Sequence, residues 1–335
     1  MISVEANAFH DNFTRSDPEP IAALPHPFTG QYDECGFPVT YLPELVLMAA
    51  SNAIREKSNW WEKFKDPVIS ARWRQELAAL REENHVPHQL ADDQIDYLFL
   101  ELEWYAEQRL KHVKPGNEIP TEIGIDGTRR ADGLVPPGLK ERLMGWVKKL
   151  MDVPEDQRDW HPDSNRQVLD LVHPQGKTME VAPMDGGIES IYFSKKFQWL
   201  STDFTISSEG RVKFESYINN VHPIEHKVMY PVLEEILELF IPMFEDVLMD
   251  MRAYPTKDKR FSVDFRDWYG DESQSFSPPS EPERYNLRTG QKLQVIVKLA
   301  NIELTPENPR YTGGSWHVEG MASENIAASG IYYYH

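Results

Sequence analysis

The sequence predicts an α+β protein with a helical N-terminal half and a second half that holds most of the strands. Apolar residues recur at helical spacing between residues 43 and 150, which is typical of amphipathic helices. After residue 153, β-branched and apolar residues form short runs between turn signals, which is typical of strands. We therefore predict an irregular arm over 1–40, a helical region over 41–152 and a mixed α/β region over 153–335.

Composition excludes several classes of protein. The 335 residues, 40% hydrophobic and 27% charged, suit one large domain or two modest ones. Acidic residues number 54 against 35 basic, and the formal net charge of −19 argues against nucleic acid or an anionic membrane as partner. No run approaches the roughly 20 apolar residues of a membrane span, and no secretory signal is evident. The single cysteine, Cys35, permits no internal disulfide, so we expect a cytoplasmic protein.

Four helices are expected in the helical region. The first follows Pro43, and the second begins at Asp66-Pro67, because Asp caps a helix and Pro suits its first position. The third begins near Asp92, and a fourth ends before Val153-Pro154. The third has the clearest apolar stripe, formed by Ile95, Leu98, Phe99, Leu102, Ala106 and Leu110. The tryptophans are expected to pack in the core: Trp60, Trp61, Trp73 and Trp104.

The mixed region is expected to contain a strand over 167–172 and a hairpin formed by 203–207 and 211–216. A long helix follows His222-Pro223, and Pro242 is expected to kink or end it. The acidic side chains of this helix are interpreted as its solvated face: Glu234, Glu235, Glu238, Glu245 and Asp246. The polar, proline-rich composition of residues 271–284 predicts a mobile surface loop.

The stretch 311–320 carries the residues that point to chemistry. His317 and Glu319 are two residues apart, so on an extended backbone their side chains face the same side. An imidazole and a carboxylate are two of the three protein ligands of a 2-His-1-carboxylate site for non-haem Fe(II). An ordinary hydrogen-bonded pair beside a turn is the alternative. Predicted strands over 292–304 and 325–334 favour a ligand pair at the mouth of a small barrel or jelly roll.

Other histidines offer weaker ligand patterns. His161 and His173 each precede a proline, and we expect them to contact backbone groups or solvent. His222 and His226 are four residues apart, but the zinc-protease signature needs a glutamate directly after the first histidine, where this chain has Pro223.

Six strings identify a wider resemblance: residues 153–162, 167–174, 196–200, 216–223, 294–304 and 313–320. Through them the chain resembles, from about Tyr41 to its last residue, a family of mostly fungal proteins catalogued as domain-of-unknown-function family 4246. That family is similar to Fe(II)/2-oxoglutarate oxygenases. The resemblance implies a double-stranded β-helix (jelly-roll, cupin-like) region, Fe(II) and 2-oxoglutarate as cofactors, and His317 and Glu319 as metal ligands.

The resemblance also implies that the chain is truncated at its C-terminus. In such oxygenases the second histidine and the basic residue that holds 2-oxoglutarate usually follow the H-x-E pair by several strands. This chain ends at His335, so the resemblance implies a partial jelly roll with two ligands of three. His335, His222 and His226 are the candidates for the third.

The sequence is compatible with two functions. The favoured one is an Fe(II)/2-oxoglutarate-dependent oxygenase that oxidises a small organic molecule. Trp316, Tyr332 and Tyr334 are candidate pocket walls, although core packing is the favoured interpretation of these side chains. The alternative is a non-catalytic, truncated relative that acts as a protein-interaction module. An unclosed barrel exposes strand edges, so self-association through an open sheet edge is also expected.

Overall fold

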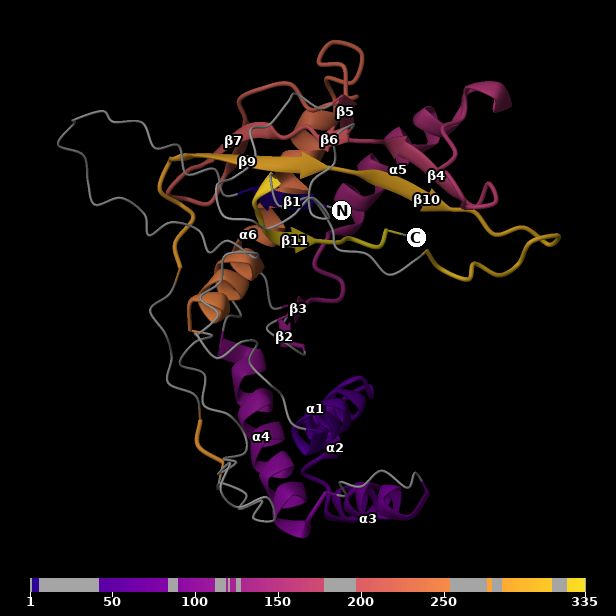
Figure 1. The fold of residues 1–335 in the computed structure, drawn as a ribbon. Coiled ribbons are helices and arrows are strands. Elements are labelled where there is room, and N and C mark those ends of the chain that lie inside the picture. The colour runs from indigo at the N-terminus through magenta and orange to yellow at the C-terminus, as the bar shows by residue number, and fades with distance from the viewer. Residues whose placement is uncertain are drawn as a thin grey trace, which may run out of the picture. The chain divides into compact units, whose positions relative to one another are not determined.

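The computed structural model describes residues 2–5, 42–83, 90–111, 119, 121–124, 128–177, 197–253, 276–278, 285–314 and 324–334. The chain divides into two compact units, which we call the sheet unit and the helical unit. The sheet unit comprises residues 1–30, 135–248 and 284–335, and the helical unit comprises 31–134 and 249–283. Helices and small antiparallel sheets are both present, which confirms the α+β class (Figure 1).

The helical unit contains the first predicted helices. They are α1 (Leu42–Arg55), α3 (Pro67–Glu83) and α4 (Asp92–Lys111), together with a short α2 (Trp60–Lys63) and the strand pair β2 (Glu122–Ile123) and β3 (Arg129–Arg130). The start of α3 confirms the capping prediction. Asp66 Oδ1 accepts the backbone N–H groups of Val68 at 2.8 Å and Ile69 at 3.1 Å, so the side chain satisfies two donors that the helix leaves open.

One apolar core holds the helical unit together. Leu47, Leu98 and Leu102 are fully buried, and Trp60 and Trp73 lie in the same cluster, which confirms their predicted packing role. Burying each such side chain stabilises the fold by about 1.5–3 kcal/mol. Within the predicted loop over 271–284, residues 276–278 are described and the others lie outside the described residues. Phe276 packs edge-on against Tyr97, with ring centroids 5.4 Å apart.

A five-stranded antiparallel sheet organises the sheet unit, in the order β11-β1-β9-β7-β8. Its strands are β1 (Ile2–Glu5), β7 (Thr202–Ile206), β8 (Val212–Phe214), β9 (Lys292–Val297) and β11 (Ile326–Gly330). Strand β1 lies inside the arm that we expected to be irregular, and it pairs with β9 on one side and β11 on the other. Apolar Ile2 and Val4 alternate with polar residues there, but the partners of β1 are remote in sequence.

The predicted hairpin is confirmed by β7 and β8. Phe204 pairs with Phe214 and Ile206 with Val212, and Phe204 and Ile206 are fully buried. The turn places Gly210 at φ +84°, a left-handed conformation that glycine adopts without the steric penalty of a Cβ.

The predicted strand over 292–304 is two strands in the structure. Strand β9 pairs with β1 and β7, whereas β10 (Leu299–Ile302) pairs with β4 (Val168–Val172). The chain therefore changes partners at Lys298, which lies between them, and a change of sheet partner leaves no mark on the apolar pattern of the sequence. A further pair joins β5 (Gln175–Lys177) to β6 (Phe197–Trp199).

Two long helices also begin in the sheet unit. They are α5 (Pro137–Met151) and α6 (Met229–Ala253). Pro242 lies inside α6, so it does not end the helix. Phe240 and Phe244 of α6 pack against Gly330 of β11, where an added Cβ would lie 2.7 Å from the Phe240 ring. Among the helices described, none combines the length and apolar character that crossing a bilayer requires.

Three of the five acidic residues of α6 that we expected on a solvated face are buried, whereas Glu235 and Glu238 are partly exposed. Glu234, Glu245 and Asp246 are 9%, 3% and 4% exposed. Glu245 accepts the backbone N–H of Leu287 at 3.1 Å through Oε1, and Arg288 Nη2 lies 3.0 Å from Oε2. The prediction was wrong because the partners of these carboxylates come from other parts of the fold, and helical spacing alone does not reveal them.

Candidate functional site

His317 and Glu319 lie outside the described residues, but the chain on both sides is described. Before them, Gln167 Nε2 donates to the carbonyl of Arg310 at 3.0 Å, beside β4. After them, the buried carboxylate of Glu324 accepts the backbone N–H of Trp199 at 2.7 Å, in β6. Both ends of the motif segment are thus fixed to strands of the sheet unit. Trp316 and His335 also lie outside the described residues.

A second group of ionisable side chains gathers beside β4. Residues 159–161 run antiparallel to this strand, because Asp170 N donates to Asp159 O at 2.9 Å and His161 N donates to Val168 O at 2.8 Å. Trp160 forms an isolated bridge with Leu169 between these two bonds. This register brings Asp159 and His161 next to Asp170, and His173 follows β4 directly in sequence.

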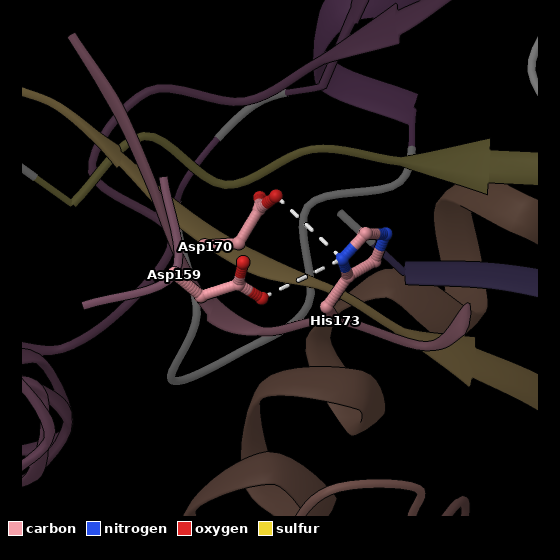
Figure 2. Close-up of side chains that lie close together, drawn as sticks. All are labelled: Asp159, Asp170 and His173. Carbon is pink, nitrogen blue, oxygen red and sulfur yellow. Dashed lines mark ion pairs between the residues drawn. The ribbon is translucent and has the colours of Figure 1, made fainter. Parts of the chain in front are cut away.

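The side chains of this group converge on one carboxylate. Asp170 Oδ2 lies 2.9 Å from His161 Nδ1 and 3.7 Å from His173 Nδ1. Asp159 Oδ2 lies 3.9 Å from the same His173 Nδ1. Figure 2 shows the Asp159 and Asp170 carboxylates both facing the His173 ring. We call Asp159, Asp170 and His173 the Asp170 cluster.

Burial sets Asp170 apart from its neighbours. The Asp170 side chain is 1% exposed, whereas His161, His173 and Asp159 are 43%, 19% and 66% exposed. Asp170 Oδ1 is buried and has no hydrogen-bond partner in the described structure. A buried carboxylate loses its hydration, and this loss must be offset by hydrogen bonds or by positive charge.

Sequence reasoning missed this group. We expected His161 and His173 to contact backbone groups or solvent, but the His161 ring is bonded to Asp170 and the His173 ring faces both carboxylates. The available signal was the turn-forming stretch 162–167 between the two histidine-containing segments. An antiparallel return through that turn places residue 161 near residue 170, as in a hairpin.

His226 and His222, which we weighed as metal ligands, form hydrogen bonds with other groups of the protein. Trp146 Nε1 donates to His226 Nδ1 at 3.3 Å, and His222 Nδ1 accepts the backbone N–H of Glu225 at 3.3 Å. Among the described residues, three side chains of His, Cys, Asp or Glu lie close enough to hold a metal ion together in the Asp170 cluster. Neither His222 nor His226 belongs to it.

An apolar pocket also lies in the sheet unit. Its walls come from α5, α6, β4, the junction of β9 with β10, and the segment after β11: Leu143, Trp146, Val172, Leu233, Ile236, Val297, Lys298, Leu299, Tyr332 and Tyr334. Tyr332 and Tyr334, which were candidates for pocket walls or for core packing, both line this pocket. Tyr334 donates its hydroxyl proton to Asn301 Oδ1. Burial raises the pKa of Tyr334 to about 12 and also raises the pKa of Tyr332.

Comparison with known proteins gives a family and no individual relative. Residues 92–335 match a family described as "Protein of unknown function (DUF4246)". Residues 8–76 match "Domain of unknown function DUF4246, N-terminal". No curated protein and no solved structure matches the chain.

Proposed function

The chain belongs to the DUF4246 family, and we propose that it is an Fe(II)- and 2-oxoglutarate-dependent oxygenase that oxidises a small organic molecule. The observation that carries the proposal is the His317-Val318-Glu319 triplet. It supplies an imidazole and a carboxylate, which are two of the three ligands of a 2-His-1-carboxylate site. In this proposal the sheet unit is part of a double-stranded β-helix, and the triplet lies at its mouth.

The neighbouring strands support the proposal. Strand β9 precedes the triplet and β11 follows it, and one strand, β1, separates them in the same antiparallel sheet. Strand β10, which pairs with β4, lies between β9 and the triplet, so the segment that bears the triplet leads from the β10–β4 pair to β11 of the five-stranded sheet. Hydrogen bonds from Gln167 to Arg310 and from Trp199 to Glu324 hold the chain before and after it. Ligands borne by a segment that is anchored to strands keep their geometry better than ligands on free loops, and in this proposal the two anchored ends position the triplet.

The apolar pocket supports a small organic substrate. The two segments that flank the triplet in sequence both contribute walls, Val297 and Leu299 before it and Tyr332 and Tyr334 after it. Apolar and aromatic walls bind the hydrocarbon part of a ligand and exclude water, and a few polar groups orient it. The Tyr332 hydroxyl is such a group, because a tyrosine hydroxyl is protonated at neutral pH and can donate a hydrogen bond. Burial raises its pKa further.

The donor set fits the metal by its chemistry. Imidazole and carboxylate donors suit Fe(II), and thiolates, which would favour other metals, are absent from the triplet. When bound, Fe(II) with 2-oxoglutarate supplies oxygen activation and the oxidising power for the substrate. The chain itself supplies the two donors, orients the ligand against the pocket walls and limits access of water. A neutral imidazole is required for coordination, so metal binding weakens as pH falls below about 6.5.

An anaerobic Fe(II) titration tests the proposal. Purified protein is titrated with Fe(II), with and without 2-oxoglutarate, and the visible charge-transfer band of the chelated keto acid is recorded. We expect a band that depends on 2-oxoglutarate and is lost in His317→Ala and in Glu319→Ala. His222→Ala is measured beside them, because His222 is an exposed imidazole of the same unit and a candidate third ligand. A lost band in this variant would identify His222 as the further ligand, and a retained band would leave His226 and His335 as the candidates.

Turnover supplies a second readout. In air, an oxygenase of this class converts 2-oxoglutarate to succinate slowly even without its substrate, and this conversion is expected to depend on His317. No band and no succinate from the folded wild-type protein would contradict the proposal. That result would favour the non-catalytic relative that acts as a protein-interaction module.

A further inference from the structure

We propose that the Asp170 cluster is a binding site for a divalent transition-metal ion, with Zn²⁺ as its simplest occupant. The site consists of Asp159, Asp170 and His173, and it uses neither His317 nor Glu319. The inference is independent of the oxygenase proposal, because it rests on described side chains beside β4. Its three donors belong to two chain segments, residues 159–161 and β4 with the following His173. Backbone hydrogen bonds hold these two segments together.

The distances between the donor atoms suit a common ion. One oxygen or nitrogen atom from each residue lies within 4.8 Å of the others. His173 Nδ1 lies 3.7 Å from Asp170 Oδ2 and 3.9 Å from Asp159 Oδ2. Zinc binds such donors at about 2.0–2.2 Å, so two ligands of a tetrahedral ion lie about 3.4 Å apart. The two separations from His173 exceed this value by about half an ångström or less, so the imidazole and each carboxylate reach a common ion with small side-chain adjustments.

The state of Asp170 points to a missing positive partner. Its side chain is 1% exposed, and its Oδ1 is buried without a hydrogen-bond partner, although Oδ2 contacts His161. A carboxylate has about four lone-pair positions, so this buried group retains unused acceptor capacity. A cation bound at the carboxylate, through one or both oxygens, offsets the cost of burying its charge.

His161 has a positioning role in this site. Its Nδ1 donates to Asp170 Oδ2 at 2.9 Å, which fixes the orientation of the carboxylate toward His173. A hydrogen bond to a ligating carboxylate is a common feature of metal sites and raises affinity. The His161 and His173 ring centroids are 6.3 Å apart, so the two rings border the same space.

The cluster is open on one side. Asp159 is 66% exposed and His173 is 19% exposed, so an ion can enter from solvent and keep a water molecule as a further ligand. The donor set of one imidazole and two carboxylates contains no thiolate. Such N/O donors suit Zn²⁺ and neighbouring first-row ions, whereas Ca²⁺ prefers six or more oxygen ligands.

Zinc titration of chelator-treated protein tests the site. Isothermal titration calorimetry is performed on the full chain carrying His317→Ala, so that the H-x-E pair does not compete for metal. We expect Zn²⁺ to bind, and we expect Asp170→Asn and His173→Gln each to weaken binding by about 10- to 100-fold or more. Asp163→Asn is the matched control, since Asp163 is exposed and outside the cluster. Its affinity is expected to be unchanged.

A spectroscopic signature separates coordination from a purely structural role. Co²⁺ in place of Zn²⁺ is expected to give a visible absorption spectrum of a low-coordinate site, lost in His173→Gln and retained in Asp163→Asn. Circular dichroism verifies the fold of each variant, and His173→Gln serves if Asp170→Asn fails to fold. Unchanged Zn²⁺ affinity in folded His173→Gln, or no binding to the parent protein, would overturn the inference. The oxygenase proposal is unaffected by either result, because its band depends on His317 and Glu319.

Discussion

Glu234 of α6 accepts the backbone N–H of Phe214 in β8, with 3.0 Å between Oε1 and N. One helical turn later, Glu238 Oε1 accepts the N–H of Val212 at 3.1 Å. Strand β8 is at the edge of the five-stranded sheet, so these two N–H groups point away from β7. The carboxylates of α6 therefore occupy the positions that another strand would need for pairing at this edge.

Removing the Glu234 carboxylate is expected to destabilise the sheet unit. In Glu234→Ala the buried N–H of Phe214 loses its acceptor, which costs about 1–3 kcal/mol. Urea unfolding followed by circular dichroism measures the change. Glu235→Ala is the control, because Glu235 makes a half-exposed ion pair with Arg142 that is worth at most about 1 kcal/mol. Equal losses in the two variants would show that the bond to β8 contributes no more than a surface pair.

Gly330→Ala is expected to destabilise the protein through overpacking. The added Cβ would lie 2.7 Å from the Phe240 ring and 3.1 Å from Phe244, and relief of such a contact costs about 1–3 kcal/mol. Gly145→Ala in α5 is the opposite case, since nothing lies within 4 Å of its added Cβ, and about 1 kcal/mol of helix propensity is gained. Thermal unfolding of both variants tests the pair. A fall in melting temperature for Gly145→Ala, or none for Gly330→Ala, would contradict this packing.

Tyr334 is expected to make stability depend on pH in the alkaline range. An unfolded tyrosine ionises near pH 10, whereas burial raises the pKa of Tyr334 to about 12. Between these values the unfolded state releases the proton and the folded state does not, so the free energy of unfolding falls as pH rises. Each pKa unit corresponds to about 1.4 kcal/mol, and the total loss is at most about 3 kcal/mol.

Tyr334→Phe isolates this contribution. The variant loses the hydrogen bond to Asn301 at every pH, at a cost of about 1 kcal/mol, but it lacks the ionisable group. Urea midpoints near pH 9 and pH 11 are compared for both proteins. We expect the wild type to lose more stability across this interval than the variant does. An equal loss would assign the alkaline sensitivity to other groups.

Two neighbouring arginines of β3 are expected to differ in their ion-pair energies. Arg129 Nη2 lies 2.6 Å from Asp250 Oδ2, and the Arg129 side chain is 6% exposed. Arg130 pairs with Glu56 at the same distance, but the two side chains are 43% and 53% exposed. Double-mutant cycles are expected to give a coupling energy of about 1–3 kcal/mol for the buried pair and under about 1 kcal/mol for the exposed one. The reverse order would contradict the burial of Arg129.

The elements that sequence reasoning found were those with local signals. Asp66 and Pro67 mark the start of α3 by their own chemistry, and the apolar stripe of α4 is complete within one segment. Glu234 carries no such mark, because its interpretation depends on a strand that precedes it in sequence and packs beside it in the fold. The Asp170 cluster was missed for the same reason, since its donors meet only through the antiparallel register beside β4.

The position of β1 has a consequence for how the sheet forms. Ile2 pairs with Val297 and with Gly330, so the N-terminal strand finds both neighbours almost a whole chain length away. During synthesis β1 leaves the ribosome long before β9 and β11, the strands with which it pairs. Contacts so distant in sequence slow folding, because the intervening chain must be confined before they form. Because β1 lies between β9 and β11 in the sheet, its two pairings can form only after the chain that carries both of them has been made.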